Sequence, residues 1–180
     1  MLVRLNGRGF RLEQHTTHRS QSLGHRRSDV DFDDLNFRRR PYDPWLAYGQ
    51  SKTANVLFAV GLTERLAGDG IVANAVHPGG IMTGLQKHVP REEQIRLGWI
   101  DSSGTPHPRL KNAEQGAATS IWAAVANELE GVGGRYLEDC GIAKAWSEDK
   151  PLSGVKPYAL DPDHARRLWS VSEQLIAIGG

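Results

Sequence analysis

Tyr48 and Lys52 are the residues whose types and spacing could do chemistry. They stand four residues apart, and in a helix that spacing places two side chains one above the other on the same face. A free phenol, with a pKa of about 10, exchanges protons poorly at neutral pH, but a partly desolvated ammonium beside it favours the phenolate by about one to three pKa units. Such a tyrosine can act as a general acid or base. An exposed helix pair has the same spacing, so the surrounding sequence must decide between the two interpretations.

A helix over residues 45–67 has to carry this pair. Its apolar residues recur near helical spacing, and the glycines at 68 and 70 end it. Apolar residues also lie beyond one narrow stripe, which predicts that a sheet and a second helix cover this helix on more than one side. The β-branched, almost continuously apolar run 71–77 predicts a strand buried on both faces, followed by a turn or loop.

The remaining segments complete an alternation of helices and strands. Residues 28–45 read as a surface loop, in which Arg38 to Arg40 form a solvated face, and residues 85–112 as a long polar excursion over the surface. A helix is expected over 113–127, then a turn and strand in "GVGGRYLEDC", then a helix in the segment that starts at Asp161. This order predicts an α/β architecture with a mainly parallel sheet.

The first residues differ from the rest of the chain. Residues 1–27 hold six arginines, one acidic residue and almost no sustained apolar periodicity. A basic disordered arm, a mis-joined start of the reading frame and an organelle transit peptide would each give such a composition. We therefore divide the chain into a basic segment, 1–21, that is disordered or unlike native structure, and a folded part, 22–180.

Composition limits the function classes. A net charge of +1 and a 24% share of charged residues do not suggest a nucleic-acid partner. Apolar runs are too short for a membrane span or a secretory signal. Cys140 is the single cysteine, so no internal disulfide forms, no thiolate metal site is expected, and a cytoplasmic location fits.

Several motifs, in order, resemble one family. "AYGQSKTANVLF" and "HPGGIMTGL" are similar to the active-site helix and the Pro-Gly loop of the short-chain dehydrogenase/reductase family, most closely its retinol-dehydrogenase-like members. The resemblance covers approximately residues 22–176. It continues through three further stretches, "KNAEQGAATSIWAA", "GGRYLEDCGIA" and "ALDPDHARRLWSVSEQL".

This resemblance implies an oxidoreductase that interconverts alcohols and carbonyls with NAD or NADP. Tyr48 would pass a proton to or from the substrate oxygen, while Lys52 would lower the tyrosine pKa and hold the nicotinamide ribose, so that both contact the cofactor. "SLGH" is similar to the family's serine motif, which implies that the Ser22 hydroxyl forms a hydrogen bond with the substrate oxygen. A serine in an ordinary loop, without any catalytic role, would fit the same sequence.

The turn after residues 71–77 resembles the loop that closes over the nicotinamide. Pro78 and Gly79 would shape it, the backbone of Ile81 would meet the carboxamide, and Thr83 would donate its hydroxyl. A plain turn after a strand uses the same Pro-Gly pair. Only its place one strand after Tyr48 and Lys52 favours the functional interpretation.

The dinucleotide-binding units of the family have no match. "NGRGF" at 6–10 lacks the preceding apolar strand, the third glycine and the following helix of the pyrophosphate-binding turn. The resemblance therefore implies the C-terminal part of a Rossmann-like, doubly wound parallel sheet, with the catalytic half present and very weak NAD(P) binding. Neither substrate identity nor cofactor preference can be read.

Two other functions stay open. The chain could be a non-catalytic remnant that acts only by association with partner subunits, with the helix at 45–67 as the site of homo-oligomer formation. It could also be an epimerase or dehydratase of the family's extended branch, which shares Tyr-x-x-x-Lys. Activity assays and sugar-nucleotide binding separate these alternatives.

Overall fold

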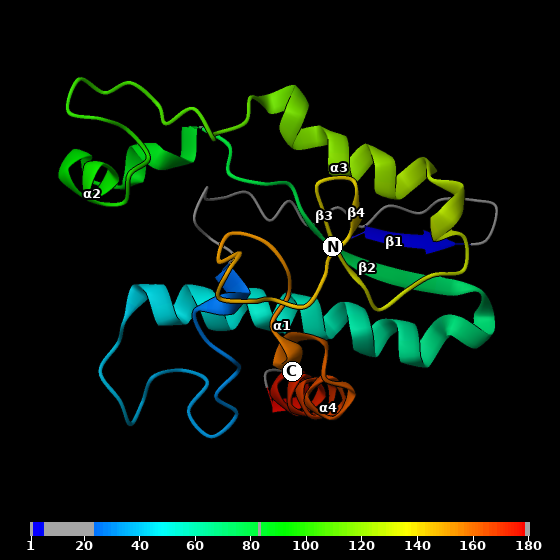
Figure 1. The fold of residues 1–180 in the computed structure, drawn as a ribbon. Helices are drawn as coiled ribbons and strands as arrows, with labels where there is room; N and C mark the ends of the chain where they lie inside the picture. The colour runs from blue at the N-terminus through cyan, green and yellow to red at the C-terminus, as the bar shows by residue number, and fades with distance from the viewer. Residues whose placement is uncertain (1, 6–23, 83, 179–180) are drawn as a thin grey trace.

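The computed structural model describes residues 2–5, 24–82 and 84–178, which form a small sheet with helices on both faces (Figure 1). Helix α3 (Ala113–Val125) covers one face and α1 (Pro44–Leu66) the other, with α4 (Pro162–Ile178) packed on the outside of α1. This arrangement confirms the mixed α/β class. The strands are β1 (Leu2–Leu5), β2 (Ile71–His77), β3 (Tyr136–Glu138) and β4 (Gly141–Ile142).

The strands lie in the order β1-β2-β3-β4 and mix two directions. β2 and β3, joined through α3, pair in parallel with Ala75 opposite Tyr136, whereas β1–β2 and β3–β4 are antiparallel. The mainly parallel sheet that we predicted is therefore not found among the described strands. The β3–β4 turn explains part of this, because Asp139 and Cys140 both adopt positive φ angles, 48° and 55°, as a two-residue hairpin turn requires.

Strand β1 lies within the segment that we predicted to be disordered or unlike native structure. Residues 2–5 pair with the edge of β2, Leu2 opposite Asn74. Edge pairing uses backbone groups that any sequence carries, so composition gives little warning of it. Residues 6–21 lie outside the described residues, and the division of the chain at residue 21 stays a prediction.

Helix α1 begins where its sequence provides both a cap and a suitable first residue. The Asp43 carboxylate accepts hydrogen bonds from the backbone N–H groups of Trp45 and Leu46, each at 2.8 Å, and Pro44 occupies the first turn. The chain leaves α1 through a short 3-10 helix that ends at Gly70, whose φ of 74° is left-handed. Helix 45–67 and strand 71–77 are thus confirmed within a residue or so.

The core lies on two sides of α1, as predicted. Val56 and Ala59 pack against Ala73 and Ala75 of β2. Leu57, which is fully buried, packs against α4 and the segment before α1. Burial of a valine or leucine side chain such as Val56 or Leu57 contributes roughly 1.5 to 3 kcal/mol. Packing on both sides therefore holds α1 in place.

The segment 85–112 is more than a polar excursion. It contains α2 (Arg91–Arg96) and a small core of its own, in which Val89 and Leu97 surround Trp99, a residue only 2% exposed. Trp45, at the start of α1, packs against this cluster. The excursion is therefore tied to the end of the helix that carries Tyr48.

The other described elements are short. No helix in the described ranges combines the length and the apolar character needed to cross a lipid bilayer. The 3-10 helices are η1 (Gly24–Arg26), η2 (Ala67–Asp69), η3 (Gly84–His88), η4 (Asn127–Leu129) and η5 (Pro157–Leu160).

Candidate active site at the start of helix α1

The Tyr48 and Lys52 side chains meet on one face of α1. The Lys52 Nζ atom lies 5.0 Å from the centre of the Tyr48 ring. Both residues are half-buried, and burial lowers the pKa of the Lys52 ammonium. A partly desolvated ammonium thus lies over the face of the Tyr48 ring.

Helix η1 closes over this pair through a glycine. A Cβ atom placed on Gly24 would lie 2.7 Å from Cγ of Lys52 and 2.8 Å from Cε1 of Tyr48. Any larger residue would have to displace one of the two side chains. Gly24 therefore provides the close approach that lets η1 form one wall of the site.

His25 anchors η1 to the rest of the fold. Its imidazole is 1% exposed and lies 4.7 Å from the Tyr136 ring, and its Nε2 accepts a hydrogen bond from the Lys156 N–H at 3.3 Å. Burial, helped by the nearby Arg26 charge, lowers the pKa of His25 to about 3, so the ring is neutral and can accept. The His25 carbonyl accepts from the hydroxyls of Thr53 and Tyr158, at 3.2 and 2.6 Å.

Arg26 crosses from η1 to the opposite side of the site. Its guanidinium, 7% exposed, donates to the carbonyls of Pro151 and Gly154 and lies 3.7 Å from the Glu138 carboxylate. Glu138 in turn accepts from the Gly154 N–H at 2.5 Å. Burial lowers the pKa of Arg26 to about 10 and raises that of Glu138, yet the arginine stays charged at neutral pH.

No sequence pattern indicated this role for Arg26. It counted there as one of six arginines in a basic segment, and its partners lie more than a hundred residues away in the chain. His25 was visible only as part of "SLGH". Their burial and their hydrogen-bond partners distinguish Arg26 and His25 from the other basic residues of this segment, and both properties depend on the tertiary fold.

The loop after β2 is tightly packed around its glycines. Gly79 has a φ of 94°, and a Cβ there would lie 2.8 Å from Cδ of Lys111. The Lys111 backbone N–H donates to the Gly80 carbonyl at 2.7 Å, and its ammonium pairs with Asp139 at 2.5 Å. The Ile81 carbonyl accepts from the Gln86 side chain at 2.8 Å, so its backbone position is fixed.

Tyr136 joins these parts into one region. Its buried ring lies 4.7 Å from His25 and stacks at 6.1 Å on His77, the residue before Pro78. Burial raises the pKa of Tyr136, and the nearby Tyr48 adds to that effect. The structure thus brings the Tyr48–Lys52 pair, η1 and the start of the Pro78 loop together.

The chain has close relatives among curated proteins. It is 48% identical over 161 residues to a protein named "Probable oxidoreductase" from Streptomyces lividans, covering 88% of this chain and 54% of that one. It is 40% identical to the short-chain dehydrogenase/reductase prx1 of Penicillium roqueforti (86% and 45%) and 37% identical to mouse retinol dehydrogenase 13 (87% and 44%). The chain belongs to the short-chain dehydrogenase/reductase family. It spans about half the length of the curated relatives it matches.

The chain is also similar to a solved structure. An uncharacterised protein from Mycobacterium paratuberculosis matches with a TM-score of 0.54 and 30% identity, over 86% of this chain and 47% of that one. No family model matches the chain. The fold shared with this structure therefore includes most of the 180 residues.

Two predicted residues of the short-chain dehydrogenase/reductase site cannot be placed. Ser22 and Thr83 both lie outside the described residues. The structure describes the surroundings of the other predicted positions, which are Tyr48, Lys52, Pro78, Gly79 and Ile81.

The described ranges contain no group of three or more His, Cys, Asp or Glu side chains arranged to hold a metal ion.

Proposed function

We propose that this chain carries the catalytic segment of an NAD(P)-dependent oxidoreductase that interconverts an alcohol and a carbonyl compound. The observation that carries the proposal is the contact of a half-buried Lys52 ammonium with the Tyr48 ring, 5.0 Å away. Family membership supports the same reaction class, because the relatives carry the names of oxidoreductases and dehydrogenases.

In this proposal Tyr48 moves the proton. Its phenol donates to the carbonyl oxygen during reduction, and its phenolate accepts the hydroxyl proton during alcohol oxidation. Lys52 stabilises the phenolate by its charge. When bound, a nicotinamide supplies or takes up the hydride. Ser22 is proposed to hold the substrate oxygen.

The described residues fit the nicotinamide end of such a cofactor. Lys52 has an ammonium that could bond ribose hydroxyls, and the turn at Gly79, with its left-handed backbone, brings main-chain groups close to the end of β2. Pro78, Ile81 and Thr83 complete the proposed carboxamide side. Within the described ranges no strand is joined by a short glycine-rich turn to the first turn of an α-helix, the arrangement that binds the pyrophosphate.

We therefore expect this 180-residue chain to bind NADPH and NADH only weakly. Contacts to the adenosine and pyrophosphate normally supply binding energy that holds the nicotinamide over the substrate. Titration calorimetry with both cofactors checks this, and micromolar affinity would show that residues outside the proposed set complete the site. Turnover with a panel of aldehydes and alcohols at high protein concentration tests the reaction itself.

A second candidate function is association without catalysis. The observation in its favour is that α3 exposes two large apolar side chains, Ile121 and Val125, at 56% and 65%. On α1, the proposed oligomer helix, Phe58 already stacks on Trp169 of the chain's own α4, with ring centres 5.5 Å apart. Self-association in sedimentation experiments combined with no detectable turnover would favour this function over the first.

Gly24→Ala is expected to reduce turnover by about tenfold to a hundredfold, with only a small loss of stability. The new methyl group meets Cγ of Lys52 and Cε1 of Tyr48, at 2.7 and 2.8 Å, so these flexible side chains must move. The matched control is Gly68→Ala, because nothing lies within 4 Å of a Cβ there. Equal activities of the two variants would contradict the proposed role of η1 as a wall of the site.

A further inference from the structure

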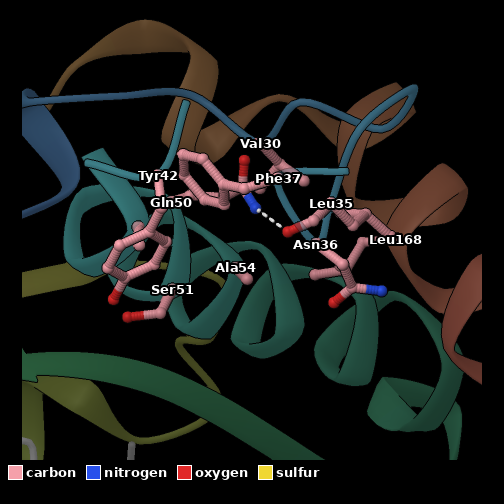
Figure 2. A pocket seen from close by; sticks show the side chains of 10 residues that line it. Val30, Leu35, Asn36, Phe37, Tyr42, Gln50, Ser51, Ala54 and Leu168 are labelled. Atoms are coloured by element: carbon pink, nitrogen blue, oxygen red, sulfur yellow. Dashed lines mark hydrogen bonds between the residues drawn. The ribbon is translucent and has the colours of Figure 1, made fainter. Parts of the chain in front are cut away.

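A cavity lies on a different side of α1 from the Tyr48–Lys52 pair. It has a volume of about 340 Å³ and lies between the segment 30–42, α1 and α4 (Figure 2). Neither Tyr48 nor Lys52 lines it. The lining is mainly apolar and consists of Val30, Leu35, Asn36, Phe37, Tyr42, Ala47, Gln50, Ser51, Ala54 and Leu168.

The rim of the cavity is fixed by one carboxylate. The side chain of Asp34 accepts hydrogen bonds from three consecutive backbone N–H groups, those of Arg38, Arg39 and Arg40, at 2.7, 3.1 and 3.2 Å. The side chains of Arg38 and Arg39 are exposed, as predicted, and that of Arg40 is half-buried. The backbone of the three arginines is held by the Asp34 carboxylate, which orders the loop.

The floor of the cavity is fixed by Gln50. This residue is 8% exposed, and its amide donates to the Leu35 carbonyl at 2.8 Å, a bond visible in Figure 2. Its oxygen accepts from the Arg40 guanidinium at 3.0 Å and from the Asp31 N–H at 3.1 Å. A buried glutamine with three hydrogen bonds to the loop therefore ties the loop to α1.

Phe37 is held in an unfavourable backbone conformation on this rim. Its φ is 54°, a value that bulky residues other than glycine rarely adopt. The Arg40 guanidinium lies 4.2 Å from the ring centre, and the Tyr42 ring meets it edge-on at 5.3 Å. Backbone strain that the surroundings maintain is frequent where a side chain must be aimed at a ligand.

The charges around the cavity indicate an uncharged ligand. Arg40 is paired with Asp31 at 3.0 Å and lies near Asp34 at 3.7 Å, so its charge is already balanced. The lining residues themselves include no carboxylate, lysine or arginine. Cavities of about 300 to 1,000 Å³ with apolar and aromatic walls are typical of small-molecule sites.

We propose that this cavity binds an uncharged aromatic molecule of one or two fused rings, between the Phe37 and Tyr42 rings and the α1 surface at Ala54. Edge-on and offset contacts with the two rings suit a flat aromatic ligand. The proposal does not depend on the proposed oxidoreductase function, because the cavity shares no lining residue with that site.

The test is a titration with 2-naphthol, followed by its fluorescence and by amide chemical shifts. We expect saturable binding to the wild-type chain, with shifts that concentrate in residues 30–42 and around Ala54. Ala54→Phe fills the cavity and should weaken binding at least tenfold. Ala118→Phe, on the exposed side of α3, is the matched control and should bind like the wild type.

Phe37→Gly keeps the test valid if Ala54→Phe does not fold. Glycine relieves the positive φ, so thermal stability should hold or rise while 2-naphthol binding falls at least tenfold. Binding that does not saturate, or that Ala54→Phe and Phe37→Gly leave unchanged, overturns the proposal. The proposal is also overturned if the two variants change the self-association of the chain but bind 2-naphthol as the wild type does. The cavity would then be a contact between copies of the chain.

Discussion

Tyr48→Phe is expected to lower turnover by about a hundredfold to ten-thousandfold, in both alcohol oxidation and carbonyl reduction. The substitution removes only the hydroxyl, and proton transfer by a positioned side chain contributes an effect of that size. The ring that contacts Lys52 and Gly24 stays, so packing should be unchanged. Rates with NADH and NADPH at high protein concentration, together with thermal unfolding, measure the two effects separately.

Lys52→Met completes this experiment. It removes the cation 5.0 Å from the Tyr48 ring while keeping an apolar stem, so alcohol oxidation should require a higher pH than in the wild type. Lys150→Met, at an exposed position, is the control for a lost positive charge. If Tyr48→Phe keeps more than a tenth of the activity, or Lys52→Met has an unchanged pH profile, the assignment of acid–base chemistry to this pair is wrong.

The elements that carry the pair were predictable because their sequences carry local signals. α1 has a capping aspartate, a helical apolar spacing and glycines after it, and β2 is a continuous β-branched run. The same signals predicted α3, β3 and α4. Such patterns depend on which residues face a core, a property that neighbouring positions already determine.

The features that the sequence did not reveal depend on contacts between residues far apart in the chain or on unusual backbone conformations. Arg26 bonds a carbonyl 128 residues further along the chain, and no local pattern encodes that contact. The β3–β4 hairpin turns through Asp139 and Cys140; aspartate is common at the first position of such a turn, but a cysteine stands where glycine usually follows. Trp99 becomes buried only because Val89 and Leu97 pack around it.

The stability of the chain should fall by roughly 3 kcal/mol between pH 7.5 and pH 5.5, with about equal parts from two histidines. Burial lowers the pKa of His25 to about 3 and that of His77 to about 4, against 6.5 for an ordinary histidine. Below pH 6.5 the unfolded chain takes up protons that the folded chain does not, so acid favours unfolding. The full stability is present above about pH 7.

Urea unfolding at a series of pH values measures this loss. His25→Gln and His77→Gln should each remove about half of the slope, whereas His88→Gln, at an exposed position, should leave it unchanged. Glu138 acts in the opposite sense, because burial raises its pKa and the folded chain then binds the proton more tightly. A free energy of unfolding that is constant from pH 7.5 to 5.5 would mean that one or both rings are not buried beside Tyr136, and the anchoring of η1 over Tyr48 and Lys52 would lose its basis.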